Sequence, residues 1–400
     1  MESAKKTHPT KPTIAVIVPK YGLVGGGERF AFEVTERMAR EGRYEFHVFA
    51  NRWRSAEGSP VIFHNVPTVK FPRFLRAFVF PWFAQRLVAR GGFNLVHSHE
   101  RIFQADIFSL HGAPHETWVR KIRQKRPSLF DRGVAAVERQ MIKNGADSFF
   151  LPVSSITKEE FRRAYTTLPG TWQILHPGVD AARFSTPDRD MCRANIRGRY
   201  GIGVSDLLIL FVGMNFETKG LDTAIAAVAK ARTKRPEANI RLLVVGRGNE
   251  KKYAAICRSL GVAEAVTFAG TQSEGIEYYY GAADIFIMPS AFDTFGMVVL
   301  EAMATGLPVI ISSNVGAKDV VKEGINGFIL PDRLDADMAA DRIIRLLDRE
   351  RRMEMGREAS RSAVLHDWNH LVGRMESLYQ DILQRKKLSA AGREKTDLHR

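Results

Sequence analysis

Apolar positions in the first half of the chain form short runs that alternate with stretches of helical periodicity. Five runs have the length of buried strands: 13–18, 46–50, 95–98, 107–110 and 148–153. Between 28 and 40, apolar side chains recur at the spacing of one helix face, and helical segments separate most of the other runs. This alternation predicts a parallel sheet with helices on both faces.

The same alternation starts again in the second half. Predicted strands lie at 207–212, 240–245, 266–268 and 284–288, and predicted helices at 221–232, 253–260, 276–283 and 296–305. The segment HPGVDAARF at 176–184 has turn chemistry and little periodicity, so we place the domain boundary there. We expect an N-terminal domain over 1–180 and a C-terminal domain over 181–370. A last helix and a basic tail occupy 371–400, with the helix at 371–383 and a disordered segment from 384 onward.

The predicted fold class is α/β, with two doubly wound, Rossmann-like domains in series. In open parallel sheets, ligands bind beyond the carboxyl ends of the strands. Two such domains that face each other across a cleft would therefore hold a ligand between them.

Composition agrees with two globular domains, because 400 residues suffice for two hydrophobic cores. The hydrophobic content of 45% and the charged content of 26% are ordinary, and no stretch approaches the ~20 apolar residues of a membrane span. The first residues, MESAKKTHPTKPT, are charged and lack an apolar stretch, so we expect no signal peptide. Cys192 and Cys257 form no metal or disulfide pattern, which fits a reducing cytosol.

Charge is distributed unevenly along the chain. The net charge is +15, and residues 1–180 carry 27 Lys and Arg against 16 Asp and Glu, a net of +11. This excess indicates an anionic partner, either nucleic acid or a membrane surface, with a merely solubilising surface as the alternative.

One basic segment is rich in aromatic residues. VKFPRFLRAFVFPWFAQRLVAR, at 69–90, interleaves Phe and Trp with Arg, and RKIRQKR at 120–126 adds positive charge. Aromatic side chains with arginine suit an interface with anionic lipid, or stacking on single-stranded nucleic acid. The alternative is that the aromatic side chains fill the core of the first domain and the arginines only flank it.

Two acids bracket a predicted helix start in DTFGMVVLEAMATGLPVI, residues 293–310. A buried strand, a glycine turn at Gly296 and a helix N-terminus together make an anion site, because the first backbone N–H groups lack partners. Asp293 precedes this helix, and Glu301 lies about two turns into it. A nucleotide sugar, with its ribose, diphosphate and hexose, fits between them. The alternative is that both acids are helix caps or surface residues.

Three glycine-containing loops follow predicted strands. The loop Gly25-Gly26-Gly27 would let a diphosphate approach the backbone, although a plain tight turn is as consistent with it. It does not match the G-x-G-x-x-G dinucleotide fingerprint. Lys219, in GMNFETKG at 213–220, would neutralise a phosphate, or would be a solvent lysine. Gly246-Arg247-Gly248 offers another close backbone approach, such as to a base.

Short acidic and histidine patterns do not predict a metal site. We reject Asp188-Arg189-Asp190 and Asp335-Ala336-Asp337 as metal-binding D-x-D motifs because neither follows a strand end. His97-Ser98-His99 places its histidines on one strand without a convincingly spaced third ligand. The metal prediction is therefore none.

The second half resembles the family 4 retaining glycosyltransferases, which have the GT-B fold. The likeness spans 207–330 through VGMNFETKGLDTAI, LLVVGRGNEKKY, VTFAGTQSEGIEYYYGAADIFIMPSAFDTFGMVVLEAMATGLPVI and VKEGINGFIL. The family's E-x7-E motif corresponds to Asp293-x7-Glu301, in which the first acid is one methylene shorter. The first half matches more loosely, through VPKYGLVGGGERFAFEVTERMAR, LPVSSITKEEF and ILHPGVDAARF. Within the family, the lipopolysaccharide core glucosyltransferases are the most similar group.

The resemblance implies roles at matched positions. Glu301 would hold the ribose hydroxyls, and Asp293 with the backbone of Thr294 to Met297 would bind the donor sugar. Lys219 would contact the diphosphate, which Gly26 and Gly27 would approach from the other domain. Asp106 and His111 would face the transferred sugar or the acceptor.

The expected catalytic residues are Asp106, His111, Lys219 and Asp293. The expected donor-binding residues are Gly26, Gly27, Lys219, Gly246, Arg247, Asp293, Phe295, Gly296, Met297, Val298 and Glu301. The family often has a basic residue before the lysine, where this chain has Thr218, so diphosphate neutralisation would lean on Arg247, Arg29 or another residue.

The resemblance therefore implies a hexosyltransferase that moves a hexose, from UDP-glucose or a related UDP-sugar, to a lipopolysaccharide core or similar glycolipid. The alternative within the family is mannosyl or N-acetylhexosaminyl transfer to another lipid-linked or polysaccharide acceptor. We expect no cofactor or metal, no nucleic-acid partner, and a cytoplasmic protein peripheral on the inner face of the cytoplasmic membrane. A nucleic-acid-binding protein lacks support from a recognition motif, and an NAD-dependent oxidoreductase lacks the glycine fingerprint.

Overall fold

The computed structural model describes residues 11–23, 25–69, 71–185, 188–272 and 274–397. The chain divides into two compact units. The first contains residues 1–153, 157–175 and 368–400, and the second contains 154–156 and 176–367. The chain passes from the first unit to the second after Leu175, five positions before the expected boundary between residues 180 and 181. The sequence did not predict that the chain returns to the first unit at Trp368.

The first unit is built on a seven-stranded parallel sheet in the order β5-β3-β1-β6-β7-β8-β9. Its strands are β1 (Thr13–Ile17), β3 (Glu45–Ala50), β5 (Ile62–Asn65), β6 (Leu95–Ser98), β7 (Ile107–Leu110), β8 (Phe149–Pro152) and β9 (Thr171–Trp172). A separate parallel pair is formed by β2 (Lys20–Tyr21) and β4 (Arg52–Trp53). Every predicted strand of the first half is present. The unpredicted strands are β2, β4 and β9, which have two residues each, and the edge strand β5, whose side chains are exposed or half-buried, so none of them has a distinct apolar run.

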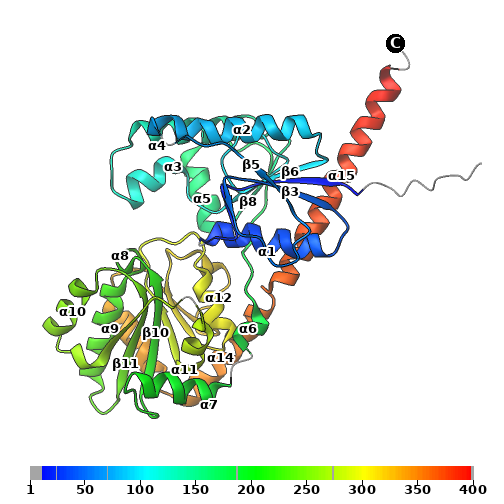
Figure 1. The fold of residues 1–400 in the computed structure, drawn as a ribbon. Coiled ribbons are helices and arrows are strands. Elements are labelled where there is room, and N and C mark those ends of the chain that lie inside the picture. The colour runs from blue at the N-terminus through cyan, green and yellow to red at the C-terminus, as the bar shows by residue number, and fades with distance from the viewer. Residues whose placement is uncertain (1–10, 24, 70, 186–187, 273, 398–400) are drawn as a thin grey trace, which may run out of the picture. The chain divides into compact units, whose positions relative to one another are not determined.

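Helices cover both faces of this sheet (Figure 1). They are α1 (Gly26–Arg40), α2 (Arg76–Gly91), α3 (His115–Thr117), α4 (Leu129–Lys143), α5 (Ser155–Ala164) and α15 (Trp368–Asp397). On one face, α2 and α4 pack on alternate strand residues such as Ala15 and Ile17. On the other face, α1 lies beside α15. Because both faces are covered, the central strand β1 is apolar and buried from Ile14 to Ile17, as is typical of parallel sheets.

The C-terminal helix differs from its prediction. We expected a helix over 371–383 and disorder from 384, but α15 continues through Asp397. Lys386 explains part of the extension, because its ammonium binds Asp106 Oδ2 and the backbone oxygen of Asn94, both in the first unit. Residues 398–400 of the predicted tail, and residues 1–10 of the charged N-terminal stretch, lie outside the described residues.

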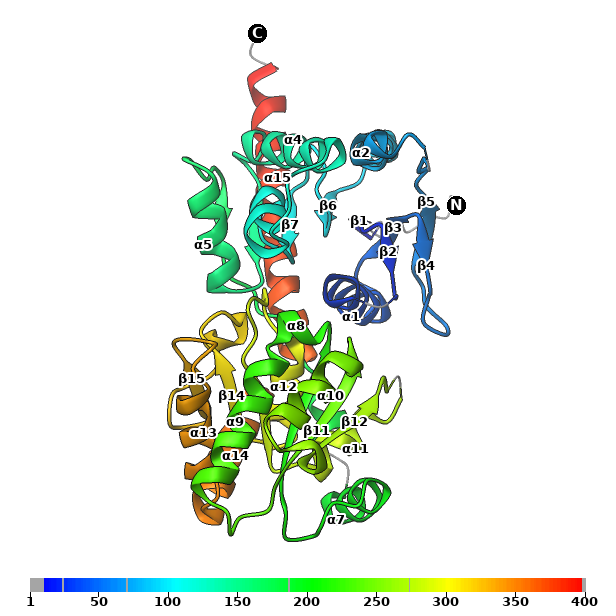
Figure 2. The same cartoon turned by 90° about the vertical axis from the view of Figure 1, so that its left-hand side faces the viewer.

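The second unit has a six-stranded parallel sheet in the order β12-β11-β10-β13-β14-β15. Its strands are β10 (Leu207–Met214), β11 (Ile240–Arg247), β12 (Val266–Gly270), β13 (Ile285–Met288), β14 (Val309–Ser312) and β15 (Gly327–Leu330). Its helices are α6 (Ala181–Ser185), α7 (Arg189–Cys192), α8 (Phe216–Lys219), α9 (Leu221–Lys234), α10 (Glu250–Ser259), α11 (Ile276–Ala282), α12 (Met297–Ala304), α13 (Ala336–Arg345) and α14 (Arg349–Val364). Figure 2 shows α9 and α10 on the near face of this sheet. Each unit is thus the doubly wound α/β domain that the sequence predicted.

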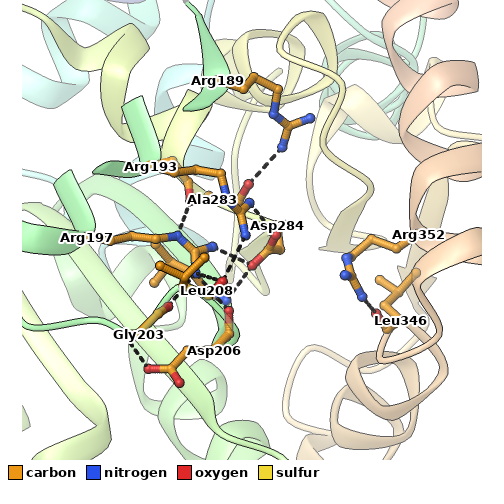
Figure 3. A network of polar contacts seen from close by, with 12 residues as sticks. Arg189, Arg193, Arg197, Gly203, Asp206, Leu208, Ala283, Asp284, Leu346 and Arg352 are labelled. Carbon is orange, nitrogen blue, oxygen red and sulfur yellow. Dashed lines mark hydrogen bonds and ion pairs between the residues drawn. The ribbon is translucent and has the colours of Figure 1, made fainter. Parts of the chain in front are cut away.

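A buried ion network closes the amino edge of the second sheet (Figure 3). Asp284, just before β13, accepts hydrogen bonds from Arg193 (2.8 Å), Arg197 (2.7 Å) and the Leu208 backbone N–H (2.8 Å). Arg197 is almost fully buried and also donates to the carbonyls of Ala282 and Asp206. Burial opposes the charge of Asp284, but these hydrogen bonds and the arginine charges hold its pKa below the usual 3.8. The network therefore fixes the edge opposite the one where a ligand would bind.

Candidate active site

The carboxyl ends of β10 and β13 meet where the strand order of the second sheet reverses. Along the chain, β10 is followed by β11 and β12 on one side, whereas β13 is followed by β14 and β15 on the other. Open parallel sheets bind ligands at such a reversal. The segment after β10 carries Lys219, and the segment after β13 carries Asp293 and Gly296. The structure therefore brings the predicted residues of these two loops to one edge of one sheet.

Lys219 and Asp293 form an ion pair across this reversal, with Lys219 Nζ donating to Asp293 Oδ2. Their side chains are 21% and 15% exposed, so the pair is accessible from solvent. Lys219 ends the short helix α8, whose start is capped by Asn215, with the Thr218 N–H donating to Asn215 Oδ1 at 3.4 Å. An anionic ligand could therefore replace the Asp293 carboxylate as the partner of a preplaced ammonium.

The backbone around Asp293 is fixed by several hydrogen bonds. Asp293 Oδ1 accepts from the Phe295 N–H at 3.2 Å, and the Asp293 backbone pairs with Asn314 O (3.0 Å) and the Gly316 N–H (2.9 Å). Gly296, with φ at +86°, leads into α12 at Met297. No described side chain caps α12, and its first turn holds no acid. The Val299 N–H donates to Gly296 O at 2.9 Å, but the N–H groups of Met297 and Val298 have no intrahelical partner and are available to bind an anion beside the ion pair.

The predicted contacts from Phe295 to Val298 line the start of this helix. Phe295 is buried, its carbonyl accepts from the Ala317 N–H at 2.7 Å, and its ring contacts that of His176. Met297 and Val298 are partly exposed. Phe295 thus fixes the turn, while Met297 and Val298 present a surface to a ligand.

Glu301 lies in the second turn of α12 and is buried. Its Oε2 accepts a hydrogen bond from the Tyr280 hydroxyl at 3.0 Å. Arg183 lies near Glu301. Burial alone would lower the pKa of Arg183, but the ion pair of Arg183 with Glu277 and the negative charge of Glu301 hold this pKa above its usual value. Tyr280 and Arg183 were not predicted as site residues, although both lie in quoted motifs, because only the fold brings them to Glu301.

Gly246 and Arg247 end β11 beside the end of β10. Gly246 pairs with Gly213 and Arg247 with Met214 in the strand register, and the Asn215 N–H donates to Arg247 O at 2.8 Å. A Cβ atom at Gly246 would lie 1.8 Å from Gly213 O, and its φ is +134°. Glycine is therefore required for the two strands to approach. The Arg247 side chain is exposed at the same edge as Lys219.

The first unit has a polar cavity of about 440 Å³ at the carboxyl ends of β1, β6 and β7. This is also a strand-order reversal, because β1 leads to β3 on one side and β6 leads to β7 on the other. The lining includes Lys20, Gly27, Glu28, His99 and His111. Gly26 is the first residue of α1, one position before the lining residue Gly27.

Gly27 and His111 are direct neighbours in this cavity. A Cβ atom added to Gly27 would lie 3.0 Å from Cγ of His111, so the glycine leaves room for the imidazole. Burial lowers the pKa of His111 to about 4. His111 is therefore neutral near pH 7, and can donate or accept a hydrogen bond without carrying charge.

Asp106 is not part of this cavity. It precedes β7, whereas His111 follows β7, so the two residues lie at opposite ends of one strand. Asp106 Oδ2 binds the Val96 N–H (2.7 Å) and Lys386 Nζ (2.7 Å) instead. The prediction placed Asp106 beside His111, but the four residues of β7 separate them along the strand direction. The structure therefore gives Asp106 a place at the amino edge of the sheet, away from the other predicted residues.

The rejected acidic patterns act as helix caps. Asp188 accepts from the N–H groups of Asp190 and Met191 at the start of α7, and Asp335 accepts from the Met338 N–H at the start of α13. Among the described residues, no group of three or more His, Cys, Asp or Glu side chains is arranged to hold a metal ion. Within the same residues, no helix is long and apolar enough to cross a membrane.

Two family models match the chain. The model described as Glycosyltransferase Family 4 matches residues 24–183, and the model described as Glycosyl transferases group 1 matches residues 193–362. The two matches correspond to the two doubly wound units and together span most of the chain.

Individual relatives agree with these matches. A D-inositol 3-phosphate glycosyltransferase of Acidothermus cellulolyticus is 33% identical over 57% of this chain and 52% of its own length, so the chain spans about half of that relative. The lipopolysaccharide glucosyltransferase WaaG of Escherichia coli is 26% identical over 80% of this chain and 85% of its own.

Solved structures share the fold. A crystal structure of WaaG, described as a glycosyltransferase involved in lipopolysaccharide biosynthesis, has a TM-score of 0.75 at 22% identity and covers 92% of this chain and 99% of its own. Anabaena HepE in complex with UDP-glucose has a TM-score of 0.69 at 16% identity, covering 92% and 99%. With two Rossmann-like domains that each match a glycosyltransferase model, the chain belongs to the family 4 glycosyltransferases of the GT-B type.

Proposed function

We propose that this glycosyltransferase moves a hexose from a UDP-sugar, UDP-glucose or a close relative, to a lipopolysaccharide core or similar glycolipid, with retention of anomeric configuration. The observation that carries the donor proposal is the Lys219–Asp293 pair beside the uncapped start of α12. An ammonium and a helix N-terminus together match a diphosphate, and an adjacent carboxylate matches sugar hydroxyls. The HepE complex with UDP-glucose supports the same donor class on the same fold.

In the proposed reaction, the diphosphate displaces the Asp293 carboxylate from Lys219, and the freed carboxylate accepts hydroxyls of the donor sugar. Glu301 binds the ribose hydroxyls, and Arg247 adds charge toward the phosphates. In the first unit, Gly26 and Gly27 contact the diphosphate, and His111 contacts the transferred sugar or the acceptor.

The bond from the anomeric carbon to the phosphate oxygen breaks, and the acceptor oxygen bonds to the same face. The leaving phosphate takes the acceptor proton. Preplaced charges at the leaving group lower the barrier, and no metal is required.

A second acceptor class is favoured by one observation. The relative that is 33% identical is a D-inositol 3-phosphate glycosyltransferase, so a phosphorylated polyol is a candidate acceptor. Lys20, in the wall of the N-terminal cavity, is exposed and forms no ion pair with the described residues. Its ammonium could bind such a phosphate.

We also propose that the first unit binds the anionic inner face of the cytoplasmic membrane through α2. The apolar side chains of residues 71–88 divide between two surfaces. Ala77, Phe80, Pro81, Ala84 and Val88 are buried, whereas Phe71 is 87% and Trp82 49% exposed, with Phe74 and Phe78 also exposed. The arginine side chain of Arg86 lies over the Trp82 ring.

Positive charge accompanies this exposed aromatic face. Arg76 and Arg86 are exposed on α2, and the exposed basic side chains of 120–126 lead into α4, which packs against α2. Apolar rings beside cations complement anionic lipid head groups and the acyl region beneath them. A glycolipid acceptor would lie in the same membrane.

The test of the proposed function is transfer from radiolabelled UDP-glucose to two acceptors, a lipopolysaccharide core lacking its hexoses and D-inositol 3-phosphate. Product NMR would report the anomeric configuration. Retention with the core acceptor is the expected result. Transfer to D-inositol 3-phosphate alone would favour the second acceptor class, and an inverted product would overturn the retaining mechanism.

A further inference from the structure

His99 and His111 form a hydrogen-bonded pair in the wall of the N-terminal cavity. His99 Nδ1 lies 3.0 Å from His111 Nε2, and the two rings are nearly parallel, at 11° with centroids 5.3 Å apart. His99 follows β6 and His111 follows β7, so adjacent strands of the sheet hold the pair. The distance and the alignment are those of a formed hydrogen bond.

The surroundings leave the pair little freedom. The His97 ring contacts that of His99, with centroids 4.2 Å apart and the planes tilted by 35°. His97 is itself held by the Tyr379 hydroxyl (2.7 Å) and the Ser109 hydroxyl (2.8 Å). The Phe30 ring contacts both His99 and His111. Gly27 supplies the space that the His111 ring occupies.

Both members of the pair are neutral near pH 7. Burial lowers the pKa of His99 well below its usual range and lowers that of His111 to about 4. A neutral imidazole carries one N–H, so one ring donates to the other across the 3.0 Å contact. Either His99 carries its proton on Nδ1 and donates, or His111 carries its proton on Nε2 and donates.

The other nitrogen of each ring decides between these arrangements. Nε2 of His99 is buried without a hydrogen-bond partner. If His111 donated, His99 would place its proton on this Nε2, and a buried N–H would be left unpaired. Unpaired buried N–H groups are rarer than under-satisfied acceptors. His99 therefore donates from Nδ1 to His111 Nε2. The His111 proton then lies on Nδ1, which makes no hydrogen bond to the described residues but, unlike Nε2 of His99, is not among the buried unpaired atoms, so water in the cavity can accept from it.

We propose that His99 is a positioning residue that fixes the ring and the tautomer of His111, so that the Nδ1–H of His111 donates a hydrogen bond to a hydroxyl oxygen of the sugar substrate. The hydrogen bond made by one nitrogen of a histidine sets the protonation of the other. His111 then acts as a fixed donor and not as a base. The substrate half of this inference rests on the proposed function, whereas the tautomer half does not.

The test combines protein labelled with ¹⁵N at histidine with transfer kinetics on the full chain. In long-range ¹H–¹⁵N spectra, with the His111 signal assigned by its loss in His111→Gln, we expect His111 as the Nδ1–H tautomer. His99→Phe keeps an aromatic ring but removes the donor, so the Nε2–H form of His111 should gain population and kcat should fall about 10- to 100-fold. His99→Asn restores an N–H near the Nδ1 position and should recover both the tautomer and most of kcat.

A matched control breaks another histidine pair in the same unit. His47 Nδ1 lies 2.8 Å from His64 Nε2, outside the cavity lining, so His47→Phe should leave kcat and the His111 tautomer unchanged. An Nε2–H tautomer of His111 in the unmodified protein would overturn the proposal, even if His99→Phe failed to fold. An unchanged tautomer and kcat in His99→Phe would overturn it as well. Absence of sugar transfer in the unmodified protein and in every variant would contradict the proposed function. The ¹H–¹⁵N spectra would still show whether His99 sets the tautomer of His111.

Discussion

Lys219 and Asp293 form an ion pair although 74 positions separate them in sequence, because β10 and β13 end side by side at the reversal of the second sheet. Each partner follows a different strand, so the pair exists only when the sheet has formed. Its position beside the uncapped start of α12 gives a single edge of the sheet an ammonium, a carboxylate and free N–H groups.

Removing the ammonium should impair transfer. Lys219→Ala deletes a charge that stabilises the leaving diphosphate, and such contacts contribute about 2–4 kcal/mol to the transition state, or roughly 30- to 1000-fold in rate. Steady-state kinetics with a UDP-sugar measure the loss. Lys230→Ala is the matched control, since Lys230 lies on α9 and pairs with the exposed Asp337. Equal transfer rates for Lys219→Ala and Lys230→Ala would show that Lys219 does not act at the donor site.

Glu301→Ala should weaken donor binding. The carboxylate is buried and oriented by Tyr280, and a hydrogen bond to a charged group contributes about 1.5–3 kcal/mol, or roughly 10- to 150-fold in affinity. Calorimetric titration with UDP measures this directly. Glu358→Ala, on α14, removes an acid that pairs only with the exposed Arg361 in the structure and should leave UDP affinity unchanged. Unaltered UDP binding in Glu301→Ala would contradict the ribose role.

Much of the second unit follows from its sequence. The limits of β10 and β13 were predicted within two residues, because runs such as LLILFV are apolar on both faces and end in glycine or proline. The resemblance also made Asp293 and Glu301 candidate site residues, and the structure places one before α12 and the other in its second turn. It did not identify Tyr280 or Arg183, since their contact with Glu301 depends on how α11 and α6 pack on α12.

The first unit was harder to predict. Trp368 packs on Phe30, and Tyr379 binds His97 across 282 positions, so local periodicity could not assign α15 to this unit. Asp106 was expected beside His111 because the two residues are close in sequence. They lie at opposite ends of β7, so their side chains are far apart along the strand. The aromatic segment at 69–90 contains both core and surface residues. Only the structure shows which side chains of α2 face the core.

Gly246→Ala should destabilise the fold. The added methyl group would overlap Gly213 O, and overpacking typically costs about 1–3 kcal/mol in unfolding free energy. Gly261→Ala is the control, because Gly261 also has a positive φ, at +67°, but opens onto free space. The difference between their urea midpoints reports the overlap together with the additional backbone strain of alanine at φ +134°. Indistinguishable midpoints would mean that the strand ends can separate without cost.

Asp284→Ala should be one of the most destabilising single substitutions in the second unit. It leaves the buried Arg197 without its carboxylate, and breaking one half of a buried pair costs about 3–5 kcal/mol. Asp337→Ala, at an exposed ion pair, should have little effect. Chemical unfolding compares the two variants, and equal stability would show that Arg197 is satisfied by backbone carbonyls alone.

The same network predicts a dependence of stability on pH. The pKa of Asp284 is held below 3.8 in the folded state, so its stabilising contribution is complete above that value and is lost as pH falls through the folded pKa. Thermal midpoints of the unmodified protein should therefore drop below pH 3.8, and the drop should be smaller in Asp284→Ala. Parallel pH curves for the two proteins would contradict this assignment.

Membrane binding should depend on the exposed face of α2. Trp82→Ala combined with Phe78→Ala should reduce cosedimentation with vesicles of phosphatidylglycerol and phosphatidylethanolamine, and added salt should weaken the binding that remains. Tyr278→Ala removes an aromatic side chain that is similarly exposed in the second unit and serves as the control. Full retention of binding by the double variant would exclude α2 as the membrane surface.

The most direct measurement for the central claim is donor hydrolysis without acceptor. Release of nucleotide would be followed across UDP-, GDP- and ADP-sugars with and without EDTA, alongside the thermal shift given by each free nucleotide. We expect that one UDP-sugar is hydrolysed, that EDTA does not abolish this activity, and that Lys219→Ala does. Absence of both hydrolysis and thermal stabilisation by any nucleotide would contradict the donor site assigned to Lys219, Asp293 and Glu301.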